Sequence, residues 1–121
     1  MEIDLLDKDG YPTMETLNKI RRWPLNDFKG MMEFIKPIWK YSDEGYWSEI
    51  DYECEEFKGT RYNLSTGGWS GNEDLVQAMG ENGMFWILCW YQSQRGGHFI
   101  FEVREPEDNQ KQIEVLAKAS D

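Results

Sequence analysis

The sequence predicts an α+β fold, in which an antiparallel sheet of about four strands packs against two N-terminal helices and one inserted helix. Three observations lead to this prediction. Apolar residues recur at helical spacing in the N-terminal part of the chain, the period changes to two from Tyr46, and a capped helix interrupts the strands after residue 69. The predicted order of elements is α-α-β-β-α-β-β, with an optional helix at the C-terminus.

The bulk composition indicates one folded domain. The chain has 121 residues, and its six Trp, six Tyr and six Phe are too many for a disordered protein. We expect residues 1–121 to form a single domain, with 105–121 as a short helix or a mobile C-terminal tail. The 13 basic and 23 acidic residues give a net charge of −10, so direct binding to nucleic acid is not expected. No apolar run is long enough to predict a membrane-spanning helix.

Two helices are predicted before the first strand, at about 14–22 and 25–39. Thr13 can cap the first helix, which carries Met14, Leu17 and Ile20 on its apolar side. In the second helix, Pro37 requires the last turn to end early or to kink. The apolar stripe of this helix is interpreted as core and consists of Phe28, Met31, Ile35, Ile38 and Trp39.

Residues 46–55 alternate between two faces and predict a half-buried strand. The face that we expect to be buried carries Tyr46, Ser48, Ile50, Tyr52 and Cys54. The face that we expect to be outside carries Trp47, Glu49, Asp51, Glu53 and Glu55. Lys58-Gly59 predicts a turn, and 60–64 predict the second strand of a hairpin that sets Arg61 among these carboxylates.

The second half of the chain predicts a helix followed by two strands. Ser70-Gly71-Asn72-Glu73 matches a capping box at the start of a helix of about 71–81, with Leu75, Val76 and Met79 turned inward. The run 84–91 is apolar on both alternating faces, which predicts a central strand covered on both sides. A turn then leads to a last strand at 98–103, with Phe99, Phe101 and Val103 on one face.

The strongest candidate for a ligand site is the glycine-rich junction, residues 65–73, between the second strand and the inserted helix. Amides freed by its glycines at the positive end of a helix dipole suit a phosphate or a carboxylate. We expect Trp69 to stack on a ring, and Arg95 and His98 to supply charge if the second hairpin turns on the same side. The predicted ligand-binding residues are Trp69, Ser70, Asn72, Arg95 and His98. The alternative is a capped turn with a purely structural role.

The acidic strand face is the second candidate site. Carboxylates two residues apart on a strand lie about 7 Å apart, which is close to the spacing of phosphates along a nucleic-acid strand. Glu49, Asp51 and Glu53 are therefore predicted to contact a protein partner, and could mimic DNA in the basic groove of a host defence nuclease. The alternative is a solvated face whose charge prevents aggregation.

No cofactor and no metal are expected. His98 is the only histidine, and Cys54 and Cys89 alternate with apolar residues, so they are interpreted as buried, inert thiols in the reducing cytoplasm. The N-terminus lacks the pattern of a signal peptide. A small hydrolase would require His98 to converge with a carboxylate such as Glu73 or Glu102, and no nucleophile elbow is present. A non-enzymatic binding protein is the favoured class, with a small anionic ligand as the alternative to a protein partner.

Five motifs carry a resemblance that covers most of residues 7–103. They are Asp9-Gly10-Tyr11-Pro12-Thr13, Trp39-Lys40-Tyr41-Ser42-Asp43, Ser65 to Glu73, Phe85-Trp86 and Arg95-Gly96-Gly97-His98-x-x-Phe101-Glu102. In these motifs the chain resembles a group of small uncharacterised proteins encoded by tailed bacteriophages and prophages. The resemblance implies a phage-borne accessory protein in the bacterial cytoplasm that acts on a host or phage component. It implies no catalytic residue.

Overall fold

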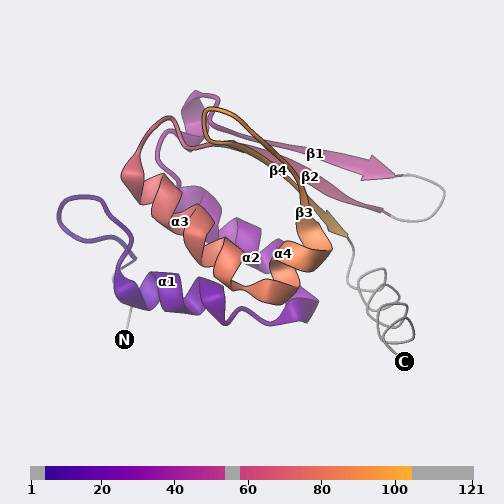
Figure 1. Cartoon of the computed structure of the whole chain (residues 1–121), viewed down its shortest axis with the longest axis horizontal. Coiled ribbons are helices and arrows are strands. Elements are labelled where there is room, and N and C mark those ends of the chain that lie inside the picture. The colour runs from indigo at the N-terminus through magenta and orange to yellow at the C-terminus, as the bar shows by residue number, and fades with distance from the viewer. Residues whose placement is uncertain (1–4, 54–57, 105–121) are drawn as a thin grey trace.

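The computed structural model describes residues 5–53 and 58–104. Within these ranges the chain forms an α+β fold of four α-helices and a four-stranded antiparallel sheet. The fold class and the antiparallel sheet are as the sequence predicts, whereas the fourth helix, α4, is not predicted. The α-helices all lie on one side of the sheet (Figure 1). The predictions for Cys54, Glu55 and the C-terminal segment lie outside the described residues. The helical elements are α1 (Met14–Arg21), η1 (Leu25–Asp27), α2 (Phe28–Ile35), η2 (Lys36–Ile38), η3 (Ser42–Glu44), α3 (Ser70–Glu81) and α4 (Gly83–Cys89).

The sheet has the strand order β1-β2-β4-β3, and all neighbours are antiparallel. The strands are β1 (Trp47–Glu53), β2 (Lys58–Ser65), β3 (Trp90–Gln94) and β4 (His98–Arg104). The central pair is β2 and β4, in which Tyr62 faces Phe101 and Leu64 faces Phe99. Lys58 and Gly59 begin β2 and do not form the predicted turn. From the strand order, the edge strands are β1 and β3.

The two N-terminal helices confirm the helical periodicity. The Thr13 hydroxyl accepts the Thr16 amide and caps α1, as predicted. Ile20 is buried, whereas Met14 is 66% exposed and lies outside the apolar side that the sequence assigns to it. The α2 helix ends at Ile35, and the next turn is a 3₁₀ turn that contains Pro37, which explains the early end.

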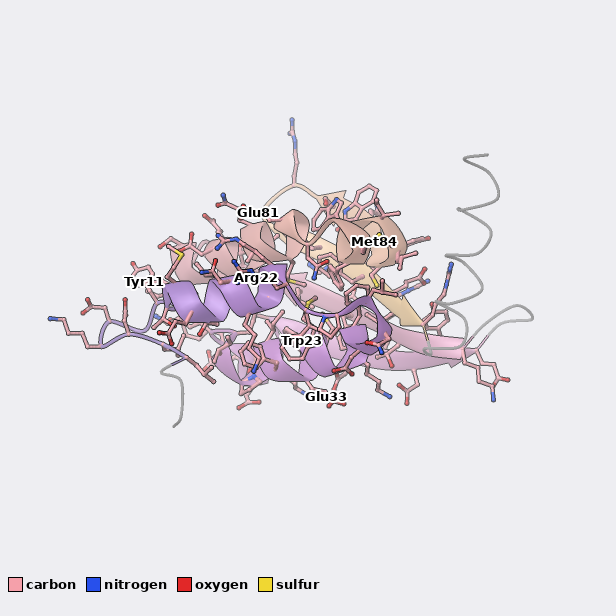
Figure 2. The ribbon with its side chains drawn as sticks, turned by 90° about the horizontal axis from the view of Figure 1, so that it is seen from below. Tyr11, Arg22, Trp23, Glu33, Glu81 and Met84 are labelled. Carbon is pink, nitrogen blue, oxygen red and sulfur yellow. The ribbon has the colours of Figure 1, made fainter. Side chains whose placement is uncertain are left out.

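The core lies between the helical layer and one face of the sheet. The apolar stripe predicted for the second helix is buried throughout. From the sheet, Phe101 is fully buried, and its ring centroid lies 5.2 Å from that of Phe85 and 5.6 Å from that of Trp86. Figure 2 looks onto the helical side and shows Trp23 in the connection between α1 and α2, and Met84 on α4.

The apolar run at 84–91 is not a central strand. Most of it forms α4, which Asn82 caps by accepting the Phe85 amide at 3.2 Å. Phe85, Leu88 and Cys89 are buried and follow helical spacing, whereas Ile87 is 63% exposed. The chain then continues as β3, an edge strand whose five residues are all exposed. A short apolar run fits both periods, and tertiary packing selects the helix here.

The first strand has the predicted alternation but the opposite orientation. Trp47 is 6% exposed and belongs to the core, whereas Ile50 is 62% exposed on the open face of the sheet. The carboxylates of β1 therefore share the face of Trp47, on the helical side, and remain exposed because β1 is an edge strand. Arg61 lies on the open face and pairs with Glu102 of β4 at 2.6 Å, not with the β1 carboxylates. The predicted orientation of β1 was wrong because it placed the acidic residues on the outer face from their polarity alone.

The buried thiol of Cys89 makes the fold less stable at alkaline pH. Burial raises the pKa of Cys89 to about 12 from its ordinary value of 9.0, and the charge of Arg104 opposes this only in part. Because the folded state favours the neutral thiol, this contribution to stability is complete below pH 9 and is lost as the pH rises towards 12.

We predict that wild-type protein loses more stability than Cys89→Ala between pH 9 and 12, by up to about 4 kcal/mol. Urea unfolding of both proteins across this range measures the difference. The comparison is needed because burial also raises the pKa of Tyr62. Identical pH profiles of the two proteins would contradict the prediction.

Candidate functional site

The glycine-rich junction lies at one end of the sheet, beside the turn between β3 and β4 (Figure 1). The Thr66 amide donates to the Gly97 carbonyl at 2.9 Å, which fixes the two loops together. Gly67 and Gly68 take positive φ values of 62° and 75°. A Cβ on Gly67 would lie 2.5 Å from the ring of Tyr46, so this position requires glycine for space as well as for conformation.

The predicted capping box is not formed. Trp69 is the N-cap residue of α3, and no side chain caps this helix. Ser70 is the first helical residue, one position too late for a capping box, and its hydroxyl lies 3.4 Å from the Tyr11 hydroxyl. The Glu73 amide donates to the Trp69 carbonyl at 3.1 Å. The amide end of α3 is therefore without a side-chain cap in the described structure.

Asn72 is fully buried and holds backbone groups together. Its Oδ1 accepts the Lys40 amide at 2.9 Å, and its Nδ2 donates to the carbonyls of Lys40 at 3.1 Å and Thr66 at 3.3 Å. These bonds occupy both ends of the side-chain amide. We therefore assign Asn72 a structural role, although the sequence placed it among the ligand-binding residues.

Trp69 lies between an aromatic ring and a cation. Its ring centroid is 4.7 Å from that of Tyr11, and the Lys40 ammonium lies 3.7 Å from the Trp69 centroid. The same ammonium is 5.3 Å from the Tyr41 ring. Sequence reasoning missed Lys40 as a site residue. Its place between two aromatic residues in the chain was the available signal, because cations favour aromatic faces.

The hairpin between β3 and β4 does turn on the side of the junction. Arg95 is exposed in this turn, and His98 is half-buried opposite Ser65. Within the described residues the side chain of His98 makes no hydrogen bond or ion pair with a carboxylate, and Glu102 is paired with Arg61. The described part of the chain also contains no group of three or more His, Cys, Asp or Glu residues placed to hold a metal ion.

The carboxylates of β1 border a groove between this strand and α2. Its lining encloses about 400 Å³ and consists of Lys29, Glu33, Lys36, Glu49, Asp51, Thr60 and Tyr62. A second hollow of about 330 Å³ shares Lys29 and Asp51 and is also lined by Tyr52, Glu53, Lys58 and Gly59. Figure 2 shows Glu33 at the margin of α2, on the side away from Met84. We call these two hollows together the α2–β1 groove.

Lysines alternate with carboxylates in the α2–β1 groove. The Lys36 ammonium lies 2.9 Å from Glu49, and the Lys58 ammonium lies 3.7 Å from Glu53. Asp51 accepts the Thr60 hydroxyl at 3.1 Å. Burial and the nearby carboxylates, first among them Glu49, raise the pKa of Tyr62, so its hydroxyl stays protonated. The groove thus has a neutral floor and a charged rim.

No protein-family model, curated protein or solved structure that was compared with the chain matches it. None of the described helices has the length and apolar character needed to cross a membrane. The function therefore has to be argued from the site itself.

We predict that Asn72→Ala lowers the free energy of unfolding by about 3 kcal/mol, because it leaves buried backbone groups without partners. Urea unfolding measures the loss. Asn26→Ala is the matched control at an exposed position and should change stability by less than about 0.5 kcal/mol. A loss at Asn72 no larger than that of the control would contradict the assigned structural role.

Proposed function

We propose that this chain is a non-enzymatic binding protein that holds a basic surface of a protein partner in its α2–β1 groove. One observation carries the proposal: Glu49, Asp51 and Glu53 align on the exposed rim of an edge strand, beside a groove. The resemblance of the sequence to phage-encoded proteins supports a phage-borne accessory role in the bacterial cytoplasm, with a host or phage component as the partner.

The existing ion pairs of the rim are easily exchanged. The side chains of Lys36 and Glu49 are 44% and 40% exposed, and those of Lys58 and Glu53 are 66% and 69% exposed. Exposed pairs of this kind contribute about 0.2–1 kcal/mol. Arginine or lysine side chains of a partner can therefore replace these lysines at little cost, and the net charge of −10 accelerates the approach of a basic surface.

The geometry favours this function over mimicry of DNA. A mimic of the phosphate backbone presents an uninterrupted row of negative charge. Here lysines pair with two of the three β1 carboxylates, and Lys29 borders both hollows. A partner surface that combines basic groups with a few acidic ones fits this lining better than a groove adapted to DNA.

Reversing the charge of the rim should weaken partner capture. We predict that Glu49→Lys combined with Asp51→Lys reduces the amount of partner captured from a bacterial lysate at least about tenfold. The reason is that attraction between the rim carboxylates and the basic surface of the partner is replaced by repulsion. Capture by the wild-type protein should also decline with rising salt. Quantitative mass spectrometry of the captured proteins measures both effects.

The matched control is Asp9→Lys combined with Glu15→Lys, which makes an equal charge change at two exposed positions outside the groove. This variant should retain the partner. Equal capture by the groove variant and the control, or capture that is indifferent to salt, would refute the proposal.

A small anionic ligand at the junction is the second candidate. The specific observation in its favour is the amide end of α3, which has no side-chain cap and lies beside Lys40. Helix N-termini of this kind favour negative charge. A ring of the ligand would have to replace Tyr11 or Lys40 on Trp69, because both already contact it. A hydrolase that uses His98 and a carboxylate is the least supported alternative.

Native mass spectrometry of gently purified protein tests this candidate. It predicts an added mass of a few hundred daltons that is lost in Lys40→Ala and in Arg95→Ala, with melting temperatures within a few degrees of wild type. A bare protein mass would argue against the ligand, as would an added mass that survives both substitutions.

A further inference from the structure

The two edges of the sheet differ in how they are protected. An unpaired strand edge is a template for another strand, and natural proteins commonly block it with charge. On β1, three carboxylates do this. On β3, the sequence Trp-Tyr-Gln-Ser-Gln has no charged residue, and all five residues are exposed. A bulge between Trp90 and Gln92 interrupts the pairing with β4 at one position, while Gln92, Ser93 and Gln94 keep a regular register.

Exposed apolar side chains lie in this edge strand and in the end of α4 that leads into it. Ile87 is 63% exposed, Trp90 is 43% exposed and Tyr91 is 51% exposed. Trp90 is held in place, because it stacks on Trp86 at 6.1 Å and its Nε1 donates to Ser93 Oγ at 2.8 Å. Aromatic side chains held in this way lose little conformational freedom when a partner binds.

Tyr91 lies on the opposite face of the sheet from Trp90. It lies on the open face of the sheet, where its ring centroid is 5.1 Å from Cζ of Arg61. Arg61 is in turn neutralised by Glu102 at 2.6 Å. The cation next to Tyr91 is therefore paired with a carboxylate. A strand added to β3 would find an apolar contact above and below its plane.

We propose that β3 binds an extended segment of a partner protein, which adds a fifth strand to the sheet by backbone hydrogen bonds. Its side chains at alternate positions contact Trp90 and Ile87 on one face and Tyr91 on the other, and are apolar there. The remaining side chains of the segment are uncharged or basic, because the protein carries a net charge of −10. The same charge opposes a second copy of this chain as the occupant.

Selection of random short peptides on the full-length protein tests the proposal. The expected result is enrichment of non-acidic peptides with apolar residues at alternate positions. Ile87→Asp and Gln92→Pro should each weaken their binding at least about tenfold, the first by removing apolar contact and the second by disrupting the strand edge. The matched control is Ile50→Asp, since Ile50 is 62% exposed on the opposite edge strand and should not affect binding.

Two results would overturn the proposal. One is the absence of enriched peptides, or enriched peptides that bind Ile87→Asp and Gln92→Pro as tightly as wild type. The other is a concentration-dependent dimer that Ile87→Asp abolishes, which would identify a second copy as the occupant. Urea unfolding checks that the variants are folded, and Ile87→Asp remains informative if Gln92→Pro is not, because Ile87 is a surface residue. Retained peptide binding in Glu49→Lys would separate this site from the α2–β1 groove.

Discussion

The buried side-chain amide of Asn72 is the interaction on which the arrangement of helices and sheet depends. It accepts a hydrogen bond from the Lys40 amide and donates to the carbonyls of Lys40 and of Thr66, which directly follows β2. One side chain thus joins the segment after α2, the junction after β2 and the first turn of α3. Because it is fully buried, no water can replace these bonds at low cost. The position of α2 relative to the sheet, and hence the α2–β1 groove, follows from this connection.

The elements that the sequence predicts well are those with a long, unambiguous period. The apolar stripe of α2 and the alternation of Phe99, Phe101 and Val103 in β4 are both confirmed. The prediction of a strand at 84–91 was wrong because a short apolar segment fits a helix and a strand equally well. The hydrogen bond by which Asn82 caps the helix depends on the surrounding fold. The predicted orientation of β1 was wrong for a similar reason. Period two identifies two faces, but which face meets the helices is decided by the tertiary structure.

The candidate sites show the same division between residue type and environment. The acidic residues of β1 were identified from the sequence, whereas Lys29 and Lys36 come from a helix whose approach to β1 no local pattern contains. Asn72 was identified as a functional polar residue, yet its hydrogen bonds are all internal. Among the described residues, the α-helices lie on one face of the sheet (Figure 1). The two edges then differ, with a charged groove beside β1 and an uncharged, aromatic edge at β3.

The most direct test of the account is an amide-resolved NMR titration of the protein with the partner that it captures. We expect the largest chemical-shift changes in β1 and in the segment 29–36 that faces it across the groove. These changes should weaken with added salt, because exposed ion pairs are exchanged on binding. Changes centred on the amide end of α3, at residues 69–72, with β1 and α2 unaffected, would contradict the account.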